Sequence, residues 1–282
     1  MDRPSIGAVI PTKNSEKLIR GVLDSLWFCQ EISVVDMFST DRTKAICAEY
    51  ANVKFYEREG YIYGNFNFGL DQLTTDWVIR LDSDERLSLE LQEEIRSLLT
   101  SKPSADVYTA IHRPYYLGRP MSYGTALKKN RRYVLFRRGM MRYKVESEHE
   151  ELTPVSGIEV RHGELQGYYA HFAVPTLTKL LQRTDYYTEC DFARCDPDKT
   201  MALPVWRLMI AIPKTFIYYY FFCKGYREGY HGFCECSMAA IYNLIHFLKS
   251  WEHRERLREH HQQVLAAFDE KLKQFRISNT SD

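Results

Sequence analysis

The sequence lacks an excess of charge of either sign. Its 38 lysines and arginines nearly balance 37 aspartates and glutamates, which gives a net charge of +1. Because nucleic-acid-binding domains usually carry a clear basic excess, we expect no nucleic-acid partner. Glycine (14) and proline (10) are too scarce for a fibrous or low-complexity chain, while 45% hydrophobic residues suffice for a folded core. The function of this globular chain must therefore be sought in local motifs.

The seven cysteines form no CxxC pair. His231, Cys234 and Cys236 lie close together, but their spacing matches no common zinc pattern. The first residues, MDRPSIGAVIPT, lack the cationic start and apolar segment of a secretory signal. We therefore expect free thiols in a reducing cytoplasm.

The N-terminal third alternates predicted strands and helices. Parallel strands with helical crossovers follow from this order, and ligands of such sheets bind at the carboxyl ends of the strands. Those ends contain Pro11–Asn14, Asp36 and Asp82–Glu85. Ser15 and Asp41 are expected to cap helices. The predicted strands are residues 6–10, 32–35, 53–56 and 77–81, and the predicted helices begin near residues 15, 41, 65 and 89.

Beyond residue 105 the pattern changes twice. From Asp106 to about His171 the alternation has a period of two, which predicts further strands that extend the sheet on the acceptor side. From Pro175 onward the pattern is helical, with a last charged helix over Trp251–Arg276. We therefore expect an α/β domain at residues 1–172 and a helical region at residues 173–282.

Residues 203–223, LPVWRLMIAIPKTFIYYYFFC, approach the length of ~20 residues that a membrane-spanning helix needs. However, Arg207 and Lys214 lie inside this stretch, and Pro213 is expected to break it. The two cations, seven residues apart, would lie on one side of a helix opposite a broad apolar face. This pattern suits a helix in the membrane interface, with Trp206 at the level of the headgroups. A packed core helix or the surface of a homo-oligomer fits equally well, and no spanning helix is expected.

Two carboxylates two residues apart, Asp82 and Asp84, follow the apolar strand that ends near Leu81. Magnesium and manganese prefer oxygen ligands and often share them with substrate phosphates. A metal held there would neutralise a diphosphate leaving group. A polar turn without function is the alternative for such a short motif. Asp36 at the end of the second strand could accept hydrogen bonds from a base or a ribose, with Thr12, Lys13 and Asn14 as the opposite wall of the pocket.

Several strings together resemble family-2 glycosyltransferases of the GT-A fold, and the nearest branch resembles the bacterial lipopolysaccharide-core and capsule type. Order and spacing agree over residues 5–100, and more loosely to about residue 255. The strings are IPTKN (Ile10–Asn14), VVDMFSTDRT (Val34–Thr43), GNFNFGL (Gly64–Leu70), DWVIRLDSDER (Asp76–Arg86), HEEL (His149–Leu152), AHF (Ala170–Phe172) and KGYREGYHG (Lys224–Gly232).

The resemblance implies a role for each matching residue. Pro11, Thr12, Asn14, Asp36 and Ser83 would hold the nucleotide of the donor, most often uridine. Asp82 would contact the ribose or the metal, and Asp84 would bind the metal, Mn or Mg. Inversion by a single displacement needs a carboxylate base, and Glu150 of HEEL matches that position. A surface charge is the alternative for Glu150. His149 and His171 would complete the metal or leaving-group site, or would be structural.

Four residues depart from the family pattern. Ser15 stands where an acidic residue is usual, Met37 and Phe38 stand where a small residue and glycine are usual, and Phe66 stands where a basic residue often precedes an asparagine. Each borders the expected nucleotide pocket, so the departures concern the base and sugar of the donor more than the metal.

The glycines of KGYREGYHG form no phosphate-binding loop, because no strand precedes them; close packing or a hinge between helices explains them better. The predicted function is an inverting, metal-dependent transfer of a sugar, UDP-linked, to a saccharide of a cell-envelope or lipid-linked glycan at the inner face of the membrane. The alternatives are transfer to a polyprenyl phosphate or a protein, and a catalytically silent domain of the same fold that binds or acts as a scaffold.

Overall fold

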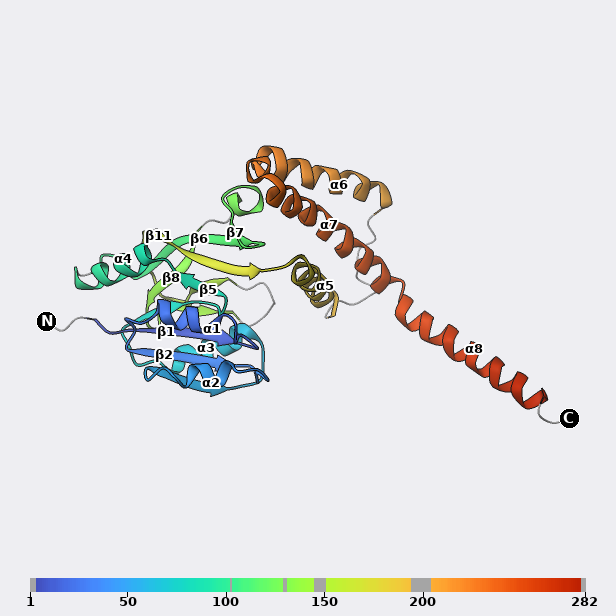
Figure 1. Ribbon diagram of the computed structural model, residues 1–282, viewed down its shortest axis with the longest axis horizontal. Coiled ribbons are helices and arrows are strands. Elements are labelled where there is room, and N and C mark those ends of the chain that lie inside the picture. The colour runs from blue at the N-terminus through green and yellow to red at the C-terminus, as the bar shows by residue number, and fades with distance from the viewer. Residues whose placement is uncertain (1–3, 102, 129–130, 145–150, 194–203, 280–282) are drawn as a thin grey trace. The chain divides into compact units, whose positions relative to one another are not determined.

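The structure, a computed structural model, describes residues 4–101, 103–128, 131–144, 151–193 and 204–279 (Figure 1). The chain separates into two compact units. The first contains the residues up to Ser122 together with Ala126–Pro175, and the second contains Tyr123–Thr125 and the residues from Thr176 onward. Every strand of the described residues belongs to the first unit, and the second unit is helical.

The first unit is built on a mixed nine-stranded sheet of order β3-β2-β1-β4-β8-β6-β11-β5, with β7 paired to β6. The four strands β3, β2, β1 and β4 are parallel, and β8 pairs antiparallel with both β4 and β6. A separate two-stranded sheet joins β9 and β10. The strands are β1 (Ile6–Thr12), β2 (Glu31–Asp36), β3 (Val53–Glu57), β4 (Trp77–Arg80), β5 (Glu85–Leu87), β6 (Val107–Tyr116), β7 (Arg119–Pro120), β8 (Arg131–Arg137), β9 (Met141–Tyr143), β10 (Leu152–Pro154) and β11 (His162–Val174).

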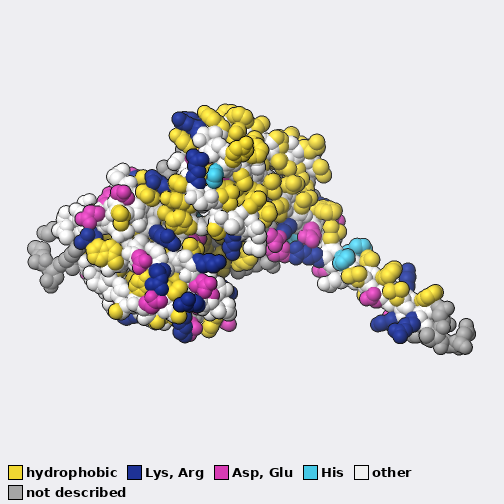
Figure 2. Space-filling model, in the orientation of Figure 1, with side chains coloured by type: hydrophobic (Ala, Val, Ile, Leu, Met, Phe, Trp, Pro, Cys, Tyr) yellow, Lys and Arg dark blue, Asp and Glu magenta, His cyan; other side chains and the backbone are white. Residues whose placement is uncertain are grey.

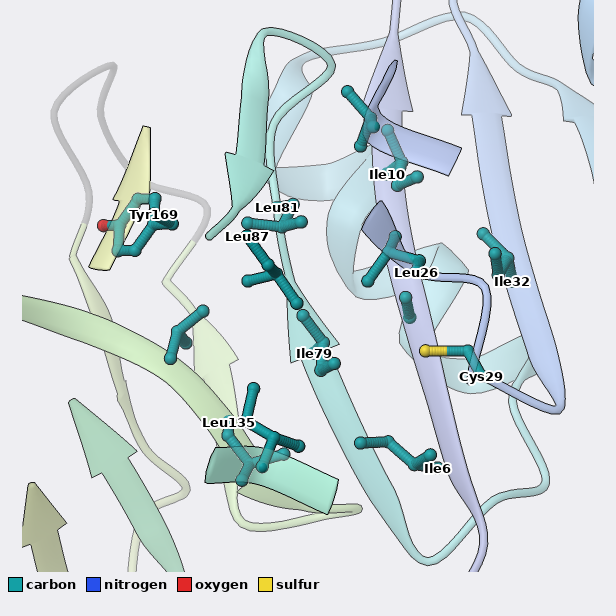
Figure 3. Packing of buried hydrophobic residues seen from close by; sticks show 14 of the residues in the cluster. Ile6, Ile10, Leu26, Cys29, Ile32, Ile79, Leu81, Leu87, Leu135 and Tyr169 are labelled. Carbon is teal, nitrogen blue, oxygen red and sulfur yellow. The ribbon is translucent and has the colours of Figure 1, made fainter. Parts of the chain in front are cut away.

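Helices cover both faces of this sheet. Successive side chains of a strand point to opposite faces, and Ile10 of β1 belongs to one buried cluster whereas Val9 belongs to another. The first cluster includes residues of α1 (Ile19–Ser25), α2 (Thr43–Cys47) and α4 (Leu89–Thr100), and Figure 3 shows part of it. The second includes residues of α3 (Ile62–Gln72). The fold class predicted from the sequence, a mixed α/β sheet of the GT-A type with a helical C-terminal region, is confirmed.

After α5 (Leu177–Ala193), the described part of the second unit contains three helices and two short helical turns. Helix α6 packs on α7, where the rings of Phe216 and Phe233 lie 5.6 Å apart and the amide of Asn243 donates to the hydroxyl of Thr215 over 2.8 Å. The segments are α6 (Val205–Ile217), the π-helical turn η3 (Tyr218–Phe222), the 3-10 turn η4 (Gly225–Glu228), α7 (Gly229–Arg254) and α8 (Leu257–Asn279); a further 3-10 turn, η1, spans Gly124–Lys128.

Two glycines of the KGYREGYHG string allow a close approach of backbones. A Cβ atom on Gly232 would lie 2.0 Å from the carbonyl oxygen of Gly225, and one on Gly225 would lie 2.6 Å from the sulfur of Cys236. Of the two predicted explanations, close packing is confirmed for Gly225 and Gly232; an added Cβ on Gly229, which has a φ of 60°, would meet nothing within 4 Å.

Three local predictions are wrong. The single helix predicted over Trp251–Arg276 is two helices, because Arg256 takes a left-handed φ of 52° between α7 and α8. Pro213 does not break α6, which continues to Ile217; a proline removes one backbone donor, and packing of α6 on α7 compensates for this loss. Ser15 does not cap a helix with its side chain, since α1 begins at Ile19.

Within the described ranges, no helix combines the length and the hydropathy needed to cross a bilayer.

Candidate functional site

The ends of β1, β2 and β4 lie at one edge of the sheet. Thr12 pairs with Asp36 in the parallel ladder, and Val9 pairs with Arg80 at the end of β4. The turn that contains Asp82 and Asp84 follows Arg80 directly and leads into β5. The three segments that the sequence places at the carboxyl ends of strands therefore meet at the same edge.

Asp36 and Asn14 hold two loops of this edge together. The Asp36 carboxylate is almost fully buried and accepts hydrogen bonds from the backbone N–H and the hydroxyl of Ser39, over 2.7 and 2.5 Å. The Asn14 N–H donates to the same hydroxyl over 2.7 Å, and its side-chain oxygen accepts from the N–H of Thr40 over 2.8 Å. These contacts fix the shape of the loops that would border a nucleotide.

The first two positions of the predicted donor pocket, Pro11 and Thr12, are buried. The carbonyl of Thr12 accepts from the N–H of Met37 over 2.9 Å, and the Thr12 hydroxyl has no hydrogen-bond partner among the described residues. Phe38, with a φ of 54°, adopts the left-handed region that favours glycine, and half of its side chain is exposed. Phe38 therefore occupies a position whose backbone conformation is typical of glycine.

Ser83 connects the turn after β4 to the first loop. Its hydroxyl lies 2.9 Å from the hydroxyl of Ser15, whose backbone N–H donates to the Thr43 hydroxyl over 2.8 Å. Ser15, expected as a helix cap, instead links the loop after β1 to the start of α2. It also links this loop to the turn of residues 82–84, which we call the aspartate turn.

A buried arginine organises the first half of the aspartate turn. Arg80 donates to Asp82 over 2.6 Å, to Glu85 over 2.9 Å and to the hydroxyl of Tyr143 over 3.0 Å. Burial opposes the charge of Arg80, but the carboxylates of Asp82 and Glu85 raise its pKa well above the ordinary value. Burial raises the pKa of Glu85, against the attraction of Arg80. Asp82 also donates its backbone N–H to Glu85 over 2.9 Å, so its position is held from two directions.

The second half of the turn meets two histidines. Nε2 of His171 lies 3.4 Å from a carboxylate oxygen of Asp84, and Nδ1 of His171 lies 2.9 Å from Nε2 of His112. Burial lowers the pKa of His112 to about 3, so this ring is neutral at pH 7. Burial also opposes the charge of His171, but the bond to Asp84 and the nearby carboxylates raise its pKa. One ring nitrogen of His171 thus shares a hydrogen bond with His112, and its other ring nitrogen faces Asp84.

The donor set fits a divalent metal ion. Glu85, His112 and His171 each place a ligand atom within 4.8 Å of the others. The Oε1 atom of the fully buried Glu85 has no hydrogen-bond partner among the described residues. Neighbouring ligands of a metal bound at about 2.1 Å lie about 3 Å apart, close to the 3.4 Å between Asp84 and His171. Asp82, by contrast, has its charge matched by Arg80.

Two predicted residues cannot be placed in this geometry. The candidate base Glu150 and the neighbouring His149 lie outside the described residues.

Phe66 is 1% exposed and packs edge-on against Tyr143, with ring centroids 5.0 Å apart, so it belongs to the core instead of lining an open pocket.

Sequence reasoning gave no role to Arg80 or His112. A signal for Arg80 exists, since it is the one charged residue in the apolar string WVIRL, where it needs a buried counter-ion. For His112 the signal is the period of two, because Tyr108, Ala110 and His112 are all buried. The hydrogen bond between His112 and His171 joins β6 and β11, which lie far apart in the sequence.

The model of the family described as glycosyl transferase family 2 matches residues 8–158, more than half of the chain. The lipopolysaccharide core biosynthesis glycosyltransferase LpsC of Rhizobium meliloti is 28% identical over 258 residues, which cover 88% of this chain and 92% of that protein. An uncharacterized glycosyltransferase of Rickettsia bellii is 37% identical over 108 residues, 37% of this chain and 36% of that protein.

Among solved structures, the mannosyltransferase PcManGT from Pyrobaculum calidifontis, in complex with GDP-Man and Mn2+, aligns over 86% of this chain and 88% of its own. Its sequence identity is 14% and the TM-score is 0.49. The match of the family model over more than half of the sequence shows that the chain belongs to glycosyl transferase family 2 and is a glycosyltransferase.

Proposed function

We propose that the protein transfers a sugar, with inversion and with a divalent metal, from a UDP-sugar to a saccharide of a cell-envelope glycan. The observation that carries this proposal is the pair formed by Asp84 and His171, which adjoins the edge where Thr12 and Asp36 end their strands. An oxygen and an imidazole ligand beside the loops that follow β1 and β2 suit a metal that carries a diphosphate.

Of the groups that could hold a metal here, we assign Asp84 and His171 as the ligands, because Nε2 of His112 is engaged with His171 and one oxygen of Glu85 is engaged with Arg80. When bound, the metal neutralises the charge that develops on the diphosphate leaving group. Asp82, fixed by Arg80 and by the carboxylate of Glu85, offers its remaining oxygen to the ribose or to the metal.

The residues of the first two loops hold the donor. Pro11, Thr12, Asn14 and Asp36 shape the nucleotide pocket, and Ser83 ties it to the aspartate turn. Because the side chains of Asp36, Asn14 and Ser83 bond to the neighbouring loop residues Ser39, Thr40 and Ser15, we assign them the orientation of the donor and not the chemistry.

Inversion needs one base that removes the proton of the acceptor hydroxyl as that oxygen attacks the anomeric carbon. We assign this role to Glu150 on the strength of the sequence pattern. Glu150→Gln should lower the turnover number by about 10²-fold or more and leave donor binding unchanged.

The acceptor proposal comes from similarity over almost the whole chain to LpsC, which is named as a lipopolysaccharide core biosynthesis glycosyltransferase. We propose an acceptor of the same class, a growing saccharide on a lipid carrier.

Thermal unfolding with UDP, GDP, CDP and dTDP, each with and without Mn²⁺, tests the donor and the metal together. A ligand at 100 times its dissociation constant stabilises a protein by about 2.7 kcal/mol, which raises the midpoint by roughly 5–10 °C for a chain of this size. We expect this shift for UDP, only with metal.

Asp84→Asn should abolish the shift, and the matched control Asp71→Asn, in a side chain that is 52% exposed on α3, should keep it. An equal shift without metal, or with Asp84→Asn, would show that the aspartate turn does not hold the metal of the donor. A larger shift with another nucleotide would replace uridine in the proposal.

A further inference from the structure

Helix α6 and the turn η3 expose a continuous set of large apolar side chains, which we call the aromatic face. At least 45% of each side chain is exposed: Trp206 (58%), Met209 (73%), Ile210 (56%), Ile217 (45%), Phe221 (56%) and Phe222 (74%). The intervals between Trp206, Ile210, Pro213 and Ile217 are four, three and four residues, so these residues lie in one row along the helix. Figure 2 shows hydrophobic side chains gathered over the region of α6 and α7. Exposed apolar patches of this kind mark interaction sites.

This face is not the side by which α6 is held in its own unit. A hydrogen bond and a ring contact with α7 use Thr215 and Phe216, which are half-buried, whereas Trp206 and Ile210 are exposed. No residue of α6 is buried. Within the residues that the structure describes, the second unit therefore leaves the aromatic face exposed.

The charged side chains within residues 204–227 all have the same sign. Residues 204–227 contain Arg207, Lys214, Lys224 and Arg227 and no aspartate or glutamate. Arg207 and Lys214 are exposed, lie seven residues apart on α6 and border the apolar row, and the guanidinium of Arg207 lies 5.5 Å from the ring of Trp206. Such a surface attracts an anionic partner.

We propose that the aromatic face docks on the surface of a bilayer that contains anionic phospholipids. In such docking the apolar side chains enter the boundary between headgroups and acyl chains, about 5–10 Å deep, and the cations meet lipid phosphates. The indole of Trp206, flanked by cations, has the amphipathic character that suits this depth.

A second copy of the chain fits the face less well. In a two-fold interface the same patch lies on both subunits, and residues 204–227 of the other copy supply no carboxylate to pair with Arg207 and Lys214. Repulsion of like charges disfavours a two-fold interface at this face. Lipid phosphates, by contrast, would pair with both cations.

Flotation of the full chain with vesicles tests the proposal. We expect binding to vesicles of phosphatidylcholine and phosphatidylglycerol at a ratio of 7:3, and much weaker binding to phosphatidylcholine alone. Each basic residue near such a surface contributes a factor of about five. Arg207→Glu with Lys214→Glu should therefore reduce the partition coefficient by about 25-fold or more.

A second variant tests the apolar contribution. Met209→Ser with Phe222→Ser should reduce binding by about tenfold or more for each side chain that leaves the interface. Since these side chains are exposed, the unfolding temperature should stay the same.

Matched controls locate the effect. Lys271→Glu with Lys273→Glu makes the same change in net charge on exposed positions of α8, and Leu89→Ser with Leu272→Ser removes two exposed leucines elsewhere (79% and 53% exposed). Both should bind as the unchanged protein does. The proposal is overturned by absence of binding to anionic vesicles, by equal losses in the controls, or by sedimentation that shows a dimer dissociated by Met209→Ser with Phe222→Ser while vesicle binding is absent.

Discussion

Nδ1 of His171 lies 2.9 Å from Nε2 of His112, while the other nitrogen of His171 faces Asp84. Metal-binding histidines usually have their second ring nitrogen held in this way, and loss of such a partner costs about 10–100-fold in metal affinity. We therefore expect His112→Phe to weaken binding of Mn²⁺ by about this factor. Titration of Mn²⁺ by calorimetry in the presence of UDP measures it.

The control is His112→Gln, whose side-chain oxygen can accept the same hydrogen bond from His171. This variant should recover most of the affinity. If His112→Phe and His112→Gln lower the affinity for Mn²⁺ equally, or if neither variant changes it, His112 does not orient His171.

The second prediction concerns the ion pair between Arg80 and Glu85. Glu85 has 0% of its side chain exposed, and that of Arg80 is 10% exposed. Removal of one partner leaves a buried charge without compensation, which costs about 3–5 kcal/mol. Arg80→Met should lower the free energy of unfolding by this amount, measured by urea unfolding at pH 7.

The double variant Arg80→Met with Glu85→Gln should be more stable than Arg80→Met alone, because the fully buried carboxylate of Glu85 no longer lacks a partner, while Asp82, with 26% of its side chain exposed, remains in contact with solvent. If the double variant is the less stable of the two, the cost comes from lost packing of the arginine and not from the carboxylate that remains.

Much of the site follows from the alternation of strands and helices. That pattern predicts a sheet edge at which the segments after Ile10, Val35 and Leu81 meet, and the register of Thr12 with Asp36 confirms that two of them end together. A parallel sheet forces this result, because its strands end on the same side. The predicted roles of Asp82, Asp84 and His171 stay predictions. The structure adds the distances between these side chains and their neighbours.

Other features depend on contacts that a local pattern does not encode. The break at Arg256 is one, since a single residue with a φ of 52° divides the stretch 251–276, whose pattern predicts one helix. The hydrogen bond between His112 and His171 is another, because it depends on the parallel pairing of β6 with β11. Pro213 inside α6 shows that packing against a neighbouring helix can overcome an unfavourable local preference.

The third prediction tests the close approach at Gly232. A Cβ atom there would lie 2.0 Å from the backbone oxygen of Gly225, which cannot move aside as a flexible side chain can. Gly232→Ala should therefore destabilise the helical unit by about 1–3 kcal/mol or more. Limited proteolysis and thermal unfolding measure the loss.

The comparison variant is Gly229→Ala in the same string. Its Cβ would meet nothing within 4 Å, but the backbone there has a φ of 60° and a ψ of −135°, so this variant measures backbone strain without a contact. Gly232 lies inside α7 and has no positive φ, so a loss for Gly232→Ala reports the contact with Gly225. An unchanged stability for Gly232→Ala would mean that the backbone of Gly225 moves aside.

The last prediction concerns the dependence of stability on pH. Glu189 of α5 accepts hydrogen bonds from Arg258 over 2.6 and 2.9 Å and forms an ion pair with Lys249 over 3.1 Å. The bonds to Arg258 lower the pKa of Glu189 to about 2, against a smaller opposing effect of burial. A pKa that is lower in the folded state stabilises the fold above the unfolded value of about 4.3, and this stabilisation is lost as the pH falls toward the folded value.

Because the Glu189 side chain is 46% exposed, solvent screens the pairs, and we expect Glu189→Gln to cost no more than about 1 kcal/mol at pH 7. Thermal unfolding of both proteins from pH 7 to pH 3 should show the difference in midpoint narrowing below about pH 4, and 1 M salt should reduce it at pH 7. Glu259→Gln, an exposed position of α8, is the control for loss of one surface charge. A difference that stays constant down to pH 3 would assign the effect of Glu189 to packing, since only the ionised carboxylate binds Arg258 and Lys249 as charges.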